Sequence, residues 1–127
     1  MRRVVTDSAI VLGWFTEATG PARDLRVEYE HGRLTIVAPR SLPVEIMEAT
    51  AVGTGWPADR LAALATELER LGLELRDPPS SELAAWLARG LSGTEAAYAA
   101  LASALDVPLV TTDPDLLRQA AIVAQRP

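Results

Sequence analysis

The chain has 127 residues, enough for one domain with a single ordinary core. Its formal net charge is −5, its 12 basic side chains are all Arg, and it contains no Cys. The lack of Cys excludes disulfides and zinc–thiolate sites, and an acidic chain is a poor general binder of nucleic-acid backbones.

No apolar run approaches the roughly 18–20 residues needed to cross a bilayer. The start of the chain, Met1-Arg2-Arg3 followed by apolar residues, is similar to a signal peptide. Asp7 interrupts that apolar stretch, however, and no clean cleavage site of small residues follows it. We therefore expect a soluble, cytoplasmic protein that does not enter a membrane.

The first half of the chain is predicted to form a strand over 3–6, a helix over 9–15, a helix over 22–31, a strand over 34–37 and a helix over 41–52. The segment 22–31 is ambiguous, because Leu25, Val27 and Tyr29 alternate as they would in a strand. Gly32 then follows it, as glycine often follows the end of a helix.

The second half is predicted to form a helix over 58–71, a strand over 73–75, helices over 81–89 and 93–105, a strand over 107–111 and a helix over 115–122. The helix over 58–71 has the clearest pattern, with Leu at the spacing of one helical face and Gly72 after it. This alternation predicts one α/β domain over 1–127. We expect a three-layer sandwich, with a central parallel sheet of four to five strands and helices on both faces.

Acidic residues follow three of the predicted strands. Asp7 comes directly after the first strand, Asp113 comes shortly after the last, and Glu45 lies beyond the strand over 34–37. The carboxyl ends of parallel strands lie along one edge of a sheet, where open α/β folds place their sites. Carboxylates gathered at one edge repel each other. Hard oxygen ligands therefore predict a Mg²⁺ or Mn²⁺ site.

Helix starts also favour acids, so a second interpretation of the same residues stays open. Ser92 and Glu95 match a capping box, and Asp113 followed by Pro114 matches a helix start. Asp7 also fits the position before a helix. One side chain can serve both as a cap and as a ligand.

The chain resembles the PIN-domain family, the ribonuclease fold of the VapC toxins, over nearly its whole length. Four pieces carry the resemblance, namely residues 5–9, residues 38–45, residues 91–102 and residues 108–113. The resemblance implies that Asp7, Glu45, Glu95 and Asp113 form the acidic quartet that binds metal and catalyses the reaction. It also implies a Mg²⁺- or Mn²⁺-dependent endoribonuclease that hydrolyses RNA phosphodiester bonds. As the toxin of a toxin–antitoxin pair, the chain would form a homodimer and bind a cognate antitoxin protein.

Two positions depart from the family pattern. Glu95 stands where the family usually has Asp, and Ala9 stands where it usually has Ser, Thr or Asn. These departures motivate an alternative function, a catalytically impaired PIN-like module that binds RNA or a protein. A third interpretation is an unrelated α/β fold in which the acids only cap helices.

Overall fold

The computed structural model describes residues 2–127, which form one five-stranded sheet in the order β3-β2-β1-β4-β5. Every strand pairs in parallel with its neighbour. The strands are β1 (Arg2–Thr6), β2 (Leu34–Pro39), β3 (Glu74–Arg76), β4 (Leu109–Val110) and β5 (Ala124–Gln125). The central parallel sheet of the sequence analysis is therefore confirmed.

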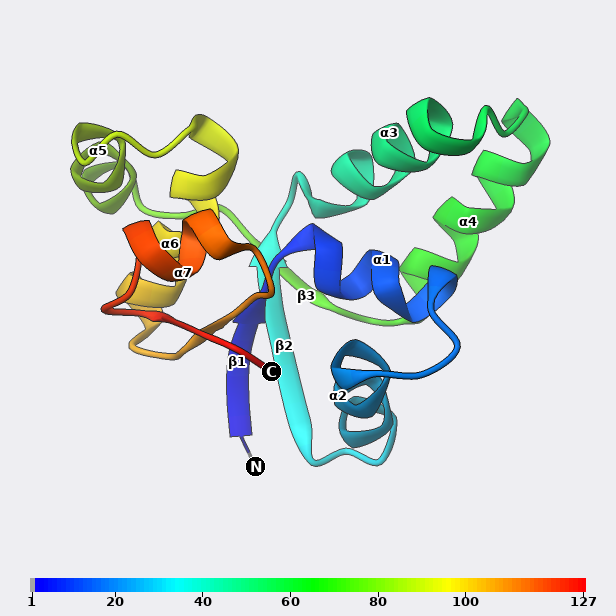
Figure 1. Ribbon diagram of the computed structural model, residues 1–127, viewed down its shortest axis with the longest axis horizontal. Coiled ribbons are helices and arrows are strands. Elements are labelled where there is room, and N and C mark those ends of the chain that lie inside the picture. The colour runs from blue at the N-terminus through cyan, green and yellow to red at the C-terminus, as the bar shows by residue number, and fades with distance from the viewer. Residues whose placement is uncertain (1) are drawn as a thin grey trace.

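Helices cover both faces of this sheet. They are α1 (Ser8–Thr16), α2 (Pro21–Glu30), α3 (Leu42–Thr54), α4 (Ala58–Arg70), α5 (Ser80–Ala88), α6 (Gly93–Leu105) and α7 (Pro114–Gln119). Figure 1 shows α1 to α4 on one side of β1 and β2, and α5 to α7 on the other. The fold is the expected α/β three-layer sandwich. None of the helices in residues 2–127 is long and apolar enough to span a bilayer.

The core lies where the central strands meet the helices. Val4 and Val5 are consecutive in β1, point to opposite faces of the sheet, and are both fully buried. Both faces of a parallel sheet are usually covered in this way, which explains the continuous apolar runs in β1 and β2. The helix α6 contacts β1, β2 and β4. Its buried alanines, such as Ala96 and Ala99, leave room for the backbone to approach the sheet closely.

The chain differs from expectation mainly near its C-terminus. The segment 22–31 is helical, as α2, and its alternating apolar residues do not form a strand. The final helix ends at Gln119 instead of residue 122, and the strand β5 was not predicted. The strand β5 is held by backbone bonds from Leu109 N to Val123 O at 2.8 Å and from Thr111 N to Gln125 O at 3.0 Å. Two paired residues leave no periodic pattern in a sequence.

The helix α3 runs two residues past its expected end at residue 52. Gly53 is helical, and the helix ends at Gly55, whose φ of 68° is left-handed. The Gly55 N–H donates to the Ala51 carbonyl at 2.9 Å, which completes the cap. Gly53 therefore needs a right-handed helical backbone, whereas Gly55, two positions later, needs a left-handed one.

We expect Gly55→Ala to destabilise the protein by about 1 kcal/mol, because an L-residue is strained in the left-handed conformation. Gly53→Ala is the matched control and should stabilise by about 0.5–1 kcal/mol, since glycine weakens a helix interior. A Cβ at either position meets no atom within 4 Å, so packing does not confuse the comparison. Urea unfolding measures both effects, and changes of the same sign would contradict this assignment of the helix end.

Candidate functional site

The carboxyl ends of the strands lie at one edge of the sheet, because all the strands are parallel. Asp7 follows β1 directly, Asp113 lies three residues beyond β4, and Glu45 lies in the first turn of α3, after β2. The strand β1 lies between β2 and β4 in the sheet. In Figure 1 the chain leaves β1 for α1 and β2 for α3 at the same end. The structure therefore brings these three acids to one edge.

The Thr111 hydroxyl links the ends of β1 and β4. It donates to Asp7 Oδ2 at 2.5 Å and accepts the backbone N–H of Asp113 at 3.0 Å. The other oxygen of Asp7 accepts the Ile10 N–H at 3.1 Å, so Asp7 is also the N-cap of α1. Both Asp7 and Thr111 are buried. A hydroxyl shared in this way fixes the direction of the Asp7 carboxylate.

The Asp7 carboxylate lies in an environment that is unfavourable for its charge. Burial raises its pKa above the ordinary value, and the nearby carboxylates of Asp113 and Glu45 raise it further. The hydrogen bonds from Thr111 and Ile10 lower its pKa, but they do not reverse the shift. Asp7, Glu45 and Asp113 are therefore close enough to interact, and the folded protein disfavours the charged form of Asp7.

The Glu45 carboxylate is held by two hydroxyls. Tyr98 donates to it, with its hydroxyl 3.2 Å from each carboxylate oxygen, and Ser41 donates to Oε2 at 2.7 Å. Tyr98 lies on α6 and is only 1% exposed. Sequence reasoning missed Tyr98. The available signal was a single hydroxyl on the apolar, alanine-rich face of a helix, three residues after Glu95.

Glu95 and Asp113 both cap helices. The Glu95 carboxylate accepts the Ser92 N–H at 3.1 Å, and the Ser92 hydroxyl accepts the Glu95 N–H at 3.2 Å, which completes the capping box. Asp113 Oδ1 accepts the Asp115 N–H at 2.9 Å. Among residues 2–127, the carboxylates that raise the pKa of Asp7, besides its burial, are those of Asp113 and Glu45, and not that of Glu95. The capping interpretation thus holds for Asp7, Glu95 and Asp113, and each carboxylate keeps further lone pairs.

The four acids have no cationic partner in the part of the chain that the structure describes. None of the ion pairs among residues 2–127 includes Asp7, Glu45, Glu95 or Asp113. Over the same residues, no three His, Asp or Glu side chains lie close enough together to hold a metal ion. The site consists of Asp7 and Asp113 bridged by Thr111, with Glu45 within electrostatic range.

A second hydroxyl at this edge is unpaired. The Thr6 side chain is fully buried at the end of β1, and its Oγ1 has no hydrogen-bond partner among residues 2–127. Thr111 is equally buried but makes two hydrogen bonds. The two threonines are a natural pair for measuring what the Thr111 bridge contributes.

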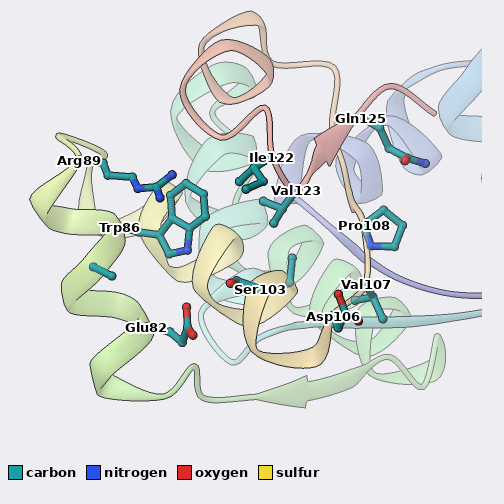
Figure 2. A pocket seen from close by; sticks show the side chains of 12 residues that line it. Glu82, Trp86, Arg89, Ser103, Asp106, Val107, Pro108, Ile122, Val123 and Gln125 are labelled. Carbon is teal, nitrogen blue, oxygen red and sulfur yellow. The ribbon is translucent and has the colours of Figure 1, made fainter.

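An open cavity lies elsewhere on the molecule. It has a volume of about 550 Å³, and none of the four predicted acids lines it. Figure 2 shows its walls, with Trp86 of α5 and Arg89 just after α5 facing Ser103 of α6 and Ile122 ahead of β5. The Arg89 guanidinium stacks on the Trp86 ring at 4.6 Å. Val107 and Pro108, which precede β4, also line the cavity, so it adjoins the segment that enters β4.

No protein-family model matches this chain, and no curated protein matches it. Among solved structures, the chain is similar to the crystal structure of PAE2754 from Pyrobaculum aerophilum, with a TM-score of 0.63 and 24% sequence identity. The match covers 94% of this chain and 86% of that one. The likeness supports the fold over nearly the whole chain.

Thr111→Val should destabilise the protein by about 2–3 kcal/mol, because it removes hydrogen bonds to a buried carboxylate and to a backbone N–H. Thr6→Val is the matched control and should stabilise by about 1 kcal/mol, because it removes a buried hydroxyl without a partner. Chemical unfolding of the two variants beside wild type checks this. Equal effects would mean that the Thr111 bridge adds nothing.

The raised pKa of Asp7 has a consequence for stability. The pKa of Asp7 is higher in the folded protein than its ordinary value of 3.8, which we take for the unfolded chain. Asp7 therefore contributes its full share of the folding free energy below pH 3.8, and this contribution is lost as the pH rises through the folded-state pKa. We expect the metal-free wild type to lose stability relative to Asp7→Asn as the pH rises from about 4 to 7. Unfolding measured across this range tests the sign. If the Asp7→Asn variant instead became less stable relative to wild type as the pH rose, this sign would be refuted.

Proposed function

We propose that this chain is a Mg²⁺- or Mn²⁺-dependent endoribonuclease of the PIN-domain kind, which hydrolyses RNA phosphodiester bonds. The observation that carries the proposal is the buried carboxylate of Asp7. It lies at the carboxyl edge of the sheet, its pKa is raised by burial and further by two other carboxylates, and it forms no ion pair among the described residues. Bringing such anions together is unfavourable unless a cation joins them.

The donor set suits a hard divalent cation. Asp7, Glu45 and Asp113 offer carboxylate oxygens, the ligands that Mg²⁺ and Mn²⁺ prefer. Each of them accepts hydrogen bonds and keeps further lone pairs that an ion could use. We assign these three acids as ligands, with Glu95 at the start of α6 as a further ligand that acts directly or through water. Mg²⁺ usually keeps several waters, so it does not require every acid in direct contact.

A divalent cation bound there would lower the pKa of a coordinated water and stabilise charge on the leaving oxygen. The role of the side chains would be to hold the cation and to orient the carboxylates that bind it. Thr111 fixes Asp7, Tyr98 and Ser41 fix Glu45, and the cap of α7 fixes Asp113. The N-termini of α1 and α7 place positive helix ends beside Asp7 and Asp113. In this mechanism none of the side chains acts as the nucleophile.

The biological setting follows from the family resemblance. We propose that the chain is a cytoplasmic toxin of the VapC kind, which forms a homodimer and is neutralised by a cognate antitoxin. The same resemblance places Asp where Glu95 stands, and in this chain the Glu95 side chain completes a capping box.

One observation favours a second candidate, a PIN-like module that binds RNA or protein without turnover. Glu95 is engaged in its capping box, and among residues 2–127 no three acids come within reach of one metal ion. Titration with Mg²⁺ or Mn²⁺ separates the candidates. An enzyme requires the ion for turnover, whereas a binding module retains RNA or a partner and cleaves nothing at any ion concentration.

We expect Asp113→Asn to lower metal-dependent RNA cleavage by more than about 100-fold, beyond what the loss of an outer-sphere partner costs. Asn retains the oxygen that accepts the Asp115 N–H, so the cap and the fold survive. Asp115→Asn is the matched control, since that exposed side chain pairs with Arg118 instead. It should cleave as fast as wild type.

The measurement follows labelled RNA with Mg²⁺, with Mn²⁺ and with EDTA, and records the melting temperature of each variant. Cleavage that survives EDTA would refute the proposed function. An Asp113→Asn variant as active as wild type would refute it too. A large fall in melting temperature for that variant alone would instead assign Asp113 to capping.

A further inference from the structure

The Tyr98 hydroxyl joins the two helical layers at the candidate site. It lies on α6, among the helices on one side of the sheet, whereas Glu45 lies on α3 on the other side. Figure 1 shows these two helices flanking the ends of β1 and β2. The contact between Tyr98 and Glu45 therefore passes beyond the strand ends, where the acids gather.

The geometry fixes the Glu45 carboxylate from two sides. The Tyr98 hydroxyl lies 3.2 Å from both carboxylate oxygens, and the Ser41 hydroxyl donates to Oε2 at 2.7 Å. A glutamate has several rotatable bonds and samples many rotamers when it is free. Two hydroxyls from two different elements select one of these rotamers, in which Glu45 raises the pKa of Asp7.

The Tyr98 hydroxyl is suited to donate. The phenol of an ordinary tyrosine is protonated at physiological pH, so the Tyr98 hydroxyl donates and the Glu45 carboxylate accepts.

Burial of this hydroxyl costs free energy that a Phe ring would avoid. The ring is 1% exposed, so a Phe would fill the same space in the core. Packing alone explains the ring but not the oxygen. The oxygen is explained by the carboxylate that it meets.

We propose that Tyr98 is a positioning residue, whose hydroxyl holds Glu45 toward Asp7 and thereby sets the affinity of the site for its divalent cation. The inference rests on the proposed function and deepens it. Hydroxyls that orient a ligand from outside the coordination sphere commonly change metal affinity by about 10–100-fold when removed.

The main test compares Tyr98→Phe with Tyr29→Phe. The Tyr29 hydroxyl donates to the Leu71 carbonyl at 2.5 Å, away from the four acids, so its removal is the matched control. With Mn²⁺ alone as the probe, Tyr98→Phe should bind about tenfold more weakly than wild type. Tyr29→Phe should bind Mn²⁺ as wild type does. Equal affinity for wild type and Tyr98→Phe would overturn the inference.

A second readout separates positioning from structural damage. If Tyr98 acts on metal affinity, RNA cleavage by Tyr98→Phe should fall at limiting Mn²⁺ and recover at saturating Mn²⁺. A rate that stays low at saturation would overturn the positioning role. If Tyr98→Phe acts through Glu45, it should also cause no further loss of affinity in a Glu45→Gln background. An equal loss in both backgrounds would overturn the inference.

Failure of the proposed function gives a different pattern. Wild type that binds no Mn²⁺ at millimolar concentration would refute the ion site, and with it any role for Tyr98 in ion affinity. A double-mutant cycle on urea unfolding, with Tyr98→Phe and Glu45→Gln in metal-free protein, then measures the coupling free energy between these two side chains. Coupling there, without Mn²⁺ binding, would make the pair structural only.

Discussion

The hydrogen bond between the Thr111 hydroxyl and the Asp7 carboxylate is the contact on which the candidate site depends. It joins the ends of β1 and β4, two neighbouring strands near the centre of the sheet. Because Thr111 also accepts the Asp113 N–H, one buried hydroxyl aligns two segments that carry carboxylates. Parallel strands alone would bring these segments to the same edge, but they would not determine the direction in which Asp7 points.

Helix capping and ion binding are complementary uses of these acids. A cap occupies part of a carboxylate and sets its direction, and the positive end of the helix lowers the cost of its charge. The structure uses this device at Asp7 and at Asp113, which allows negative charge to accumulate at the edge without cationic side chains from the described residues. What distinguishes Asp7 from an ordinary cap is its burial and the repulsion it receives from Glu45 and Asp113.

The part of the site that could be predicted is the part fixed by strand ends. Asp7 and Asp113 follow β-branched runs, and parallel pairing then requires that they share an edge with Glu45. Tyr98 could not be found in this way, because its contact with Glu45 spans 53 residues and crosses from one helical layer to the other. Only the assembled packing determines such a contact. The strand β5 escaped prediction for a related reason, since two residues carry no periodic pattern and become a strand through their pairing with β4.

The charge distribution bears on how an acidic chain would act on RNA. Among residues 2–127, seven Arg side chains pair with Asp or Glu of the same chain. Two more, Arg60 and Arg89, stack on the rings of Trp56 and Trp86. Arg side chains engaged in this way are less available for backbone phosphates, which are bound by displacing counterions with Lys and Arg. A divalent cation among the carboxylates would reverse the sign of the local charge where cleavage takes place. Under the proposed function, the ion would therefore recruit the RNA as well as support the chemistry, so RNA binding and cleavage should depend on the metal together. A binding module without a metal site would have to attract RNA through the remaining Arg side chains alone, against a net charge of −5.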